Sequence, residues 1–141
     1  MPNDADDLAL RDALVQMSFE VMGRLTQLAA EEGMSLTQLR VLGVLRDRRP
    51  RMADLAGGLG LDRSSVTGLI DRAQARGLVE RVREEGDGRV VRVALTEDGR
   101  IAAERMAERA SELLADVIAP LPAATRASLL AGLEQAFVAR F

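Results

Sequence analysis

The sequence predicts a mainly α-helical domain that carries one small β-hairpin. Leu, Ala, Val, Ile and Met must form its core, because there are only three Phe and no Trp or Tyr. Apolar residues recur at a spacing of three and four along several segments, which is typical of amphipathic helices. Only residues 78–95 break this pattern, since valine there alternates with charge around a glycine-containing turn. The length of 141 residues suits one domain with its own core.

Three helices are expected in the first sixty residues. Apolar residues at helical spacing predict the first helix from about residue 6 to residue 32. Ser35 and Gln38 form a Ser-x-x-Gln capping box, so a second helix should begin there. We expect this helix to end near Pro50, because proline pushes the preceding residue out of the helical region. A short third helix, residues 52–58, precedes a glycine-rich turn.

The segment after Asp62 predicts a fourth helix with one apolar and one polar face. Asp62 is a typical N-cap residue, and Gly77 stands where a glycine commonly terminates a helix. The apolar residues follow the i, i+3, i+4, i+7 spacing of a helix face that packs on a core. They are Val66, Leu69, Ile70 and Ala73.

A β-hairpin and two further helices complete the predicted order. Residues 78–83 and 89–95 read as strands, and the Glu-Glu-Gly-Asp-Gly segment between them has the composition of a turn. Thr96 is expected to cap a fifth helix that extends to about residue 119. Pro120 and Pro122 then separate this helix from a sixth.

A helix followed by a strand, a glycine turn with arginines, a second strand and a new helix is the order of a winged helix-turn-helix. In such a fold the helix can enter a DNA major groove while the turn reaches the neighbouring minor groove. We therefore expect a single domain, residues 1–141, in which a winged helix-turn-helix lobe spans residues 35–96. Helices within residues 6–32 and 97–140 flank this lobe.

The charge distribution agrees with a nucleic-acid partner, although the net charge is −3. Residues 40–92 hold twelve arginines and eight carboxylates, and the rest of the chain is acidic. A basic middle between acidic ends can present one face to phosphates. All nineteen basic residues are arginine. The base composition of the genome is the simplest reason, and selection for bidentate phosphate and guanine contacts is the alternative.

The chain contains no cysteine and no histidine. This excludes disulfides and thiolate nucleophiles, and it removes the usual general base and the commonest metal ligand. We identify no catalytic residue, no metal site and no cofactor motif, and we expect no enzyme. The acidic start of the chain is unlike a signal peptide, and no apolar run approaches the ~20 residues that cross a bilayer. We therefore expect a cytoplasmic protein without membrane contact.

The polar face of the fourth helix supplies the first candidate DNA-binding residues. Short hydroxyl side chains can meet phosphates or base edges, and arginine can bind phosphate or guanine. Gly68 would let the helix backbone approach a groove closely, and close packing of another helix is the alternative reason for a glycine there. For the arginines the alternative is simple solvation. The candidates are Arg63, Ser64, Ser65, Thr67, Gly68 and Arg72.

The hairpin supplies the second group of candidates. Arg89 follows the hairpin tip, and a narrow minor groove attracts arginine. Arg83 and Arg92 are expected to flank it on phosphate. An acid at a DNA-facing tip repels phosphate, so we expect Asp87 to pair with Arg89 or to cap the turn. An ordinary charged hairpin is the alternative for the whole group.

Two segments resemble the MarR family of bacterial transcriptional regulators. Residues 87–99, DGRVVRVALTEDG, match the family's wing signature of Asp-x-Arg, five residues and Leu-Thr-x-x-Gly at every fixed position. Residues 64–81, SSVTGLIDRAQARGLVER, resemble the family's recognition-helix segment. The chain departs from the family pattern at Gly68, where a longer and often basic side chain is frequent. It departs again at residues 73–75, where a leucine is expected.

The resemblance implies a homodimer in which the first, fifth and sixth helices of two chains interlock, so that they are dimerisation helices. Dimer symmetry then predicts a pseudo-palindromic operator. Many family members bind a small aromatic or anionic effector between these helices and the DNA-binding lobe, which lowers operator affinity. The resemblance thus implies a repressor released by a ligand. Candidate lining residues are Met17, Met22, Arg40, Arg46 and Met106, although methionines at helical spacing are also common in cores.

The sequence leaves two functions open. The first is a dimeric, sequence-specific regulator that binds double-stranded DNA. The second is a winged helix that contacts another protein and does not bind DNA. The net acidity of the chain and the acidic hairpin tip, with Glu84, Glu85 and Asp87, permit this second function.

Overall fold

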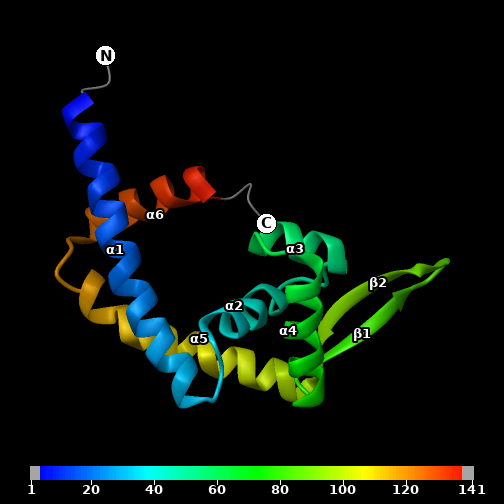
Figure 1. Ribbon diagram of the computed structural model, residues 1–141. Helices are drawn as coiled ribbons and strands as arrows, with labels where there is room; N and C mark the ends of the chain where they lie inside the picture. Colours follow the sequence, from blue (N-terminus) through cyan, green and yellow to red (C-terminus); the bar gives the residue numbers. More distant parts are fainter. Residues whose placement is uncertain (1–3, 138–141) are drawn as a thin grey trace.

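The computed structural model describes residues 4–137, which form six helices and one hairpin (Figure 1). The helices are α1 (Asp4–Glu31), α2 (Leu36–Leu45), α3 (Met52–Leu59), α4 (Arg63–Ala75), α5 (Glu97–Ile118) and α6 (Ala123–Phe137). The antiparallel strands are β1 (Val79–Glu84) and β2 (Asp87–Leu95). The predicted mainly α-helical class with a winged helix-turn-helix is confirmed. The predicted ends of the domain, residues 1–3 and 138–141, lie outside the described residues.

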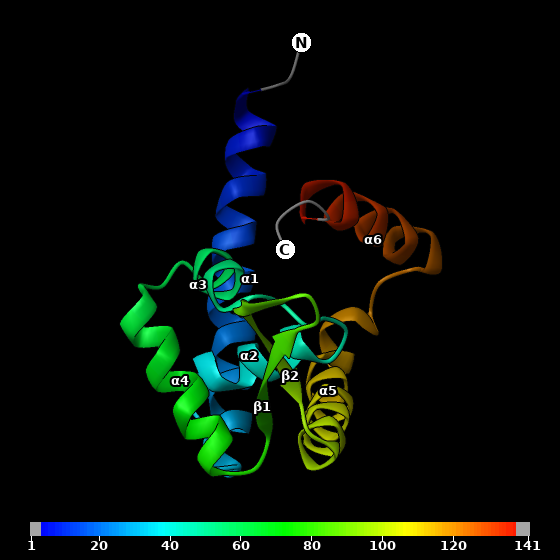
Figure 2. The ribbon, with the colours of Figure 1, turned by 90° about the vertical axis from the view of Figure 1, so that its right-hand side faces the viewer.

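The elements form two parts, which we call the lobe and the arm. The lobe consists of α2, α3, α4 and the hairpin, and the arm consists of α1, α5 and α6. The hairpin projects from the lobe on the side away from α1 (Figure 1), and a view turned by 90° separates α6 from α1 (Figure 2). Both α1 and α5 contact α2 and each other. Within the arm, Arg24 of α1 binds Asp116 of α5 with an Nη1–Oδ1 distance of 2.6 Å.

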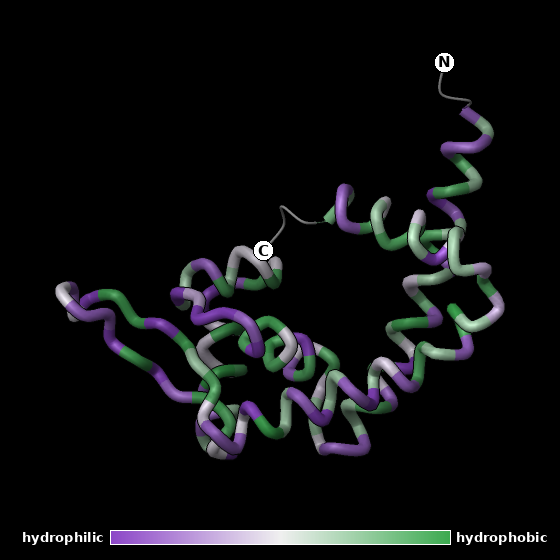
Figure 3. Tube along the Cα trace, turned by 180° about the vertical axis from the view of Figure 1, so that it is seen from behind, coloured by the Kyte–Doolittle hydropathy of each residue, from purple (hydrophilic) through white to green (hydrophobic). Residues whose placement is uncertain are grey.

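The buried apolar cluster of the described residues lies in the lobe. It takes residues from all three helices and both strands, and it confirms the predicted apolar face of α4. Its members are Val41, Leu42, Leu45, Leu55, Ala56, Leu59, Val66, Leu69, Ile70, Ala73, Val79 and Val93, with Ala103 from α5. By contrast, no residue of α6 is buried, and hydrophobic residues recur along the uncovered lengths of α1 and α6 (Figure 3).

The helix α2 ends at Leu45, earlier than the end predicted near Arg49 and Pro50. The backbone N–H of Val93 donates to the carbonyl oxygen of Pro50 at 2.9 Å, and a β-bridge joins residues 51 and 92. The chain before α3 is therefore extended beside β2. The proline rule placed the end too late because this pairing is a long-range contact.

The hairpin turn is tighter than predicted. The strand β1 extends to Glu84, which pairs with Asp87, so the turn consists of Glu85 and Gly86 and not of residues 84–88. Gly86 has a φ of +89°, a conformation that favours glycine.

The junction between the hairpin and α5 explains the Leu-Thr-x-x-Gly signature in physical terms. The Thr96 hydroxyl accepts a hydrogen bond from the N–H of Gly99 at 3.0 Å and donates to the carbonyl oxygen of Gly77 at 2.5 Å. A Cβ on Gly99 would stand 1.7 Å from the carbonyl oxygen of Leu78. The first turn of α5 therefore lies directly against the chain that leaves α4, and this contact holds the hairpin in place relative to α4.

Candidate nucleic-acid interface

The helix α4 begins with a cap that uses two predicted DNA-binding residues. Asp62 accepts hydrogen bonds from the Ser64 hydroxyl at 2.7 Å, the Ser65 N–H at 2.8 Å and the Ser65 hydroxyl at 3.0 Å. These bonds, led by that from Ser64, lower the pKa of Asp62 to about 2. Thr67 likewise donates to the carbonyl oxygen of Arg63 at 2.8 Å. The three exposed hydroxyls can still accept hydrogen bonds, which suits the amino groups of adenine and cytosine better than phosphates.

Three of the predicted arginines have guanidinium groups without a partner among the described residues. Within residues 4–137, the guanidinium groups of Arg63, Arg72 and Arg89 form no hydrogen bond and no ion pair. All three residues are exposed, two on α4 and one just past the hairpin turn. Their donors can therefore bind phosphate or base edges without first losing a partner.

The other two predicted arginines brace the hairpin. Arg83 donates to the carbonyl oxygen of Gly88 at 2.6 Å. Arg92 binds Glu84 at 2.8 Å and donates to the carbonyl oxygen of Arg49 at 2.9 Å. The hydrogen bond from Arg92 is the largest cause that lowers the pKa of Glu84. DNA contacts of these two arginines stay predictions, and each would compete with an existing bond.

Asp87 has one of the two roles expected for it. Its Oδ1 accepts a hydrogen bond from the backbone N–H of Arg89 at 3.1 Å, so the carboxylate caps the turn. The cap holds the backbone of Arg89 but leaves its guanidinium free. An acid at the tip thus positions the arginine without neutralising it by a direct pair.

A groove of about 490 Å³ lies between the hairpin and the first turns of α4. Thr67 and four arginines are among the residues that line it. The arginines are Arg51, Arg63, Arg81 and Arg89. Sequence reasoning did not select Arg51 or Arg81 as site residues. Strand alternation was the signal for Arg81, because it lies on the strand face that also carries a buried valine. Arg51 gave no local signal, since its place depends on the β-bridge to β2.

Gly68 has no packing partner that explains it. A Cβ at this position would come within 4 Å of only one described atom outside its own helix backbone, the Nη1 of Arg72, at 3.3 Å. Close packing of another helix, one of the two reasons considered for this glycine, is therefore not observed within the described chain.

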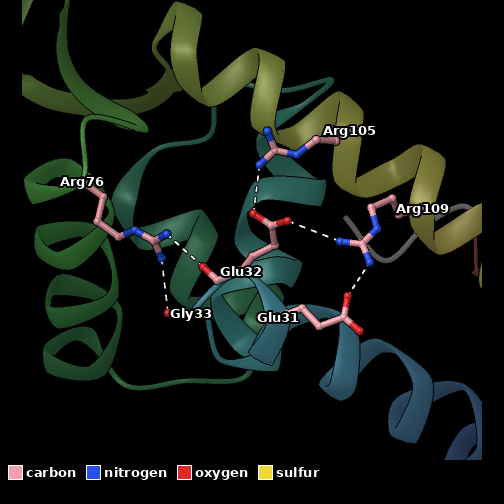
Figure 4. A network of polar contacts seen from close by, with 6 residues as sticks. All are labelled: Glu31, Glu32, Gly33, Arg76, Arg105 and Arg109. Carbon is pink, nitrogen blue, oxygen red and sulfur yellow. Dashed lines mark hydrogen bonds and ion pairs between the residues drawn. The ribbon is translucent and has the colours of Figure 1, made fainter.

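A polar network fixes the end of α4 against the arm (Figure 4). Arg76, the C-cap residue of α4, donates to the carbonyl oxygens of Glu32 at 3.0 Å and Gly33 at 3.3 Å. The Glu32 carboxylate binds Arg105 at 2.9 Å and Arg109 at 3.3 Å, both on α5. Glu32 therefore joins the end of α1 to both α4 and α5.

A second cavity, of about 510 Å³, lies between the lobe and the arm. Three of the five predicted effector residues line it, namely Met22, Arg40 and Met106. Met17 lies outside the lining because it is more than a third of a turn from Met22 around α1, and Arg46 lines a different pocket after the end of α2. Sequence reasoning missed the apolar lining, because apolar helix faces look alike in a core and in a cavity. This lining includes Leu25, Leu36, Leu39 and Leu61.

Residues 4–137 contain no group of three or more carboxylates placed to hold a metal ion. None of the helices in this described range has both the length and the apolar character needed to cross a membrane.

Comparisons with known proteins agree with this geometry. The MarR family model matches residues 32–90. An uncharacterised HTH-type transcriptional regulator of Bacillus subtilis, YfiV, is 38% identical over 68 residues, which are 48% of this chain and 42% of YfiV. The HTH-type transcriptional repressor NicR of Pseudomonas putida is 30% identical over 105 residues, 74% of this chain and 66% of NicR. The chain thus spans less than half the length of the Bacillus subtilis relatives that it matches.

Three solved structures share the fold over most of the chain. A MarR family protein from Bacillus stearothermophilus has a TM-score of 0.83 and 24% identity, covering 96% of this chain and 95% of its own. Mutant MarR from E. coli, complexed with operator DNA, has a TM-score of 0.71 and 22% identity, covering 94% of this chain and 96% of its own. NadR in complex with 4-hydroxyphenylacetate has a TM-score of 0.76 and 24% identity over 89% and 90%. At sequence identities of 22–24%, these similarities show a shared fold alone.

Proposed function

The chain belongs to the MarR family of transcriptional regulators, and on this premise we propose that it is a dimeric regulator that binds double-stranded DNA in a sequence-specific way. In this proposal α4 is the recognition helix in the major groove, and the hairpin is a wing that reaches the minor groove. The observation that carries the proposal is the set of unpaired arginines, Arg63, Arg72 and Arg89. The first and last of these line the groove between α4 and the hairpin.

The charge of the lobe supports a polyanionic partner. Residues 40–92 carry a local charge of +4, whereas the rest of the chain carries −7. Arginine contacts to phosphate supply affinity, and contacts to base edges supply specificity. We assign the first role to the arginines of the groove and the second to the short polar side chains on the exposed face of α4. Mutant MarR from E. coli, which shares this fold, is complexed with operator DNA, and this supports a DNA duplex as the partner.

The exposed apolar surface of the arm supports a homodimer. Phe19 is 64%, Leu10 60% and Leu130 59% exposed. Large apolar side chains that stay exposed along the helices of one part support an interface there, and a second copy of the arm offers matching side chains. In this proposal the segments 6–32 and 97–140 are the dimerisation helices. Two-fold symmetry then requires a pseudo-palindromic operator, with half-sites centred about 10 bp apart.

The cavity between the lobe and the arm supports release from DNA by a small aromatic or anionic effector. Its walls are largely apolar and suit a ring, and Arg40 can bind a carboxylate. A ligand there would touch α2 of the lobe as well as α1 and α5 of the arm, so it can change their relative placement. The bound 4-hydroxyphenylacetate of NadR fits this class, and NicR is a transcriptional repressor, which supports repression as the mode of action. In this proposal the protein acts in the cytoplasm.

Selection from a random duplex library tests the proposal directly. Bound fragments are recovered at low and near-physiological salt and sequenced. We expect a two-fold symmetric motif that persists at the higher salt. Retention without a motif, lost as salt rises, would mean that only backbone charge is recognised. No retention at either salt would overturn the proposal and favour a winged helix that contacts protein through its acidic tip.

A further inference from the structure

Gly68 is one of two places on α4 where the chain departs from the family pattern, and the structure shows which side chain occupies the space there. Glycine lowers helix stability relative to alanine, so its presence inside α4 has a cost that packing does not explain. The Nη1 of Arg72 lies 3.3 Å from the point where a Cβ of residue 68 would stand. The guanidinium of Arg72 therefore covers the helix surface at position 68.

Helix geometry explains how Arg72 reaches this position. Residues at i and i+4 lie on the same helix face, and side chains of an α-helix point back toward the N-terminus. A side chain at position 68 would meet the guanidinium of Arg72. Without one, Arg72 can lie along α4 and present the flat guanidinium close to the helix backbone.

The neighbouring acid does not neutralise this guanidinium. Asp71 precedes Arg72 in the chain, but its carboxylate binds Arg81 of β1 with an Oδ1–Nη2 distance of 2.7 Å. Arg81 also binds Gln74, which holds it toward α4. Within the described residues Arg72 thus keeps all its donors free, on an exposed face whose other members, Ser64 and Thr67, have short side chains.

We propose that Gly68 and Arg72 form one base-reading unit that recognises a guanine at a fixed position in each operator half-site. The glycine and the short hydroxyl side chains let α4 approach the floor of the major groove. The Arg72 guanidinium, held near the helix surface, donates two hydrogen bonds to O6 and N7 of the guanine. The arginine thereby brings a basic group to position 68, where the family pattern often has a basic side chain. This inference rests on the proposed function, since it requires α4 to lie in a major groove.

The test uses the operator recovered with the wild-type chain and duplexes in which single bases of each half-site are changed. Competition binding is measured for the variants Arg72→Ala, Arg72→Lys, Gly68→Leu and the double variant Gly68→Leu/Arg72→Ala. We expect the wild type to prefer guanine at one symmetric position by about 5- to 100-fold. Arg72→Ala and Arg72→Lys should lose this preference, because lysine keeps the charge but not the planar fork. Gly68→Leu should lose it too, and the double variant should be no worse than Arg72→Ala.

Two controls separate an effect on base recognition from an effect on folding. Gly57→Leu places leucine on a glycine of α3 that has open space around it, and it should keep the preference for guanine. Gly68→Leu should unfold at a higher temperature than the wild type, because leucine is the better helix former. Equal loss of affinity for every duplex in Arg72→Ala, or a preserved preference in Gly68→Leu, would overturn the base-reading unit. If the wild type itself selects no motif, the proposed function fails; if the wild type selects one that Arg72→Ala retains, only this inference fails.

Discussion

The lobe and the arm are built from similar apolar residues, but they bury them in different ways. In the lobe, side chains from three helices and two strands close around Leu42, Leu55 and Ile70, which are almost fully buried. In the arm, α6 buries nothing, and Phe19 of α1 is 64% exposed. The lobe is also the basic part of the chain. The contrast supports our proposal that one chain completes its DNA-binding part alone, whereas the arm packs against a second chain.

The largest expected effect is on the junction that completes the lobe. Gly99→Ala would place a Cβ 1.7 Å from the carbonyl oxygen of Leu78, so the first turn of α5 must move away from the end of α4. We expect a loss of about 3 kcal/mol or more in the free energy of unfolding, measured by urea denaturation. Gly57→Ala, at a glycine with open space around it, is the matched control and should be neutral or stabilising. Similar unfolding curves for both variants would contradict the close contact between Gly99 and Leu78.

The second prediction concerns the arm. Phe19→Asp introduces a charge on the exposed apolar surface of α1 and should weaken dimerisation about tenfold or more, as measured by sedimentation. Val82→Asp is the control in the lobe, because Val82 is an exposed apolar residue of β1. It should leave the association unchanged. A dimer of unaltered strength in Phe19→Asp would show that α1 does not form the interface.

The third prediction concerns the end of α1, which binds α5 through the Glu32 carboxylate. Glu32→Gln removes the ion pairs with Arg105 and Arg109 and should lower the free energy of unfolding by about 0.5–1 kcal/mol. Glu104→Gln is the control, since Glu104 pairs with Arg100 inside α5 alone. Thermal unfolding of both variants gives the comparison. Equal effects would mean that the ion pairs between Glu32 and α5 do not stabilise the fold.

The smallest expected effect is a dependence of stability on pH. The pKa of Asp62 is lowered from 3.8 to about 2 in the folded chain. Because the unfolded state binds the proton more readily, the contribution of this carboxylate is complete above about pH 4 and is lost as the pH falls toward 2. The urea midpoint of the wild type should therefore fall more steeply between pH 4 and pH 2 than that of Asp62→Asn. If the urea midpoints of the two proteins fall in parallel with pH, the Asp62 cap does not contribute to stability in acid.

Local rules predicted most of the lobe. The caps at Ser35, Asp62 and Thr96 depend on hydrogen bonds within one helical turn, and a sequence contains this information. The end of α2 at Leu45 depends on pairing with β2, and the need for Gly99 depends on contact with the preceding loop. These long-range contacts are absent from any local pattern.

In the candidate site, too, residue type and spacing predicted some features, while others depend on long-range contacts. Residue type and spacing placed Arg63, Arg72 and Arg89 on exposed surfaces, but they could not show which arginines the protein itself uses. Arg92 binds Glu84, a contact that depends on the register of the hairpin. Likewise, Met17 falls outside the cavity between the lobe and the arm, because the lining of this cavity depends on how α1 packs against its neighbours.

DNA binding through the lobe is tested by comparing unpaired arginines from the two parts of the molecule. Arg89 of the lobe and Arg11 of the arm are both exposed and have no partner among residues 4–137. The operator affinity of each alanine variant is measured over a range of salt concentrations, with the oligomeric state checked in parallel. We predict that Arg89→Ala binds about tenfold or more weakly as an intact dimer, while Arg11→Ala binds like the wild type. Equal affinities for Arg89→Ala and the wild type would contradict this prediction.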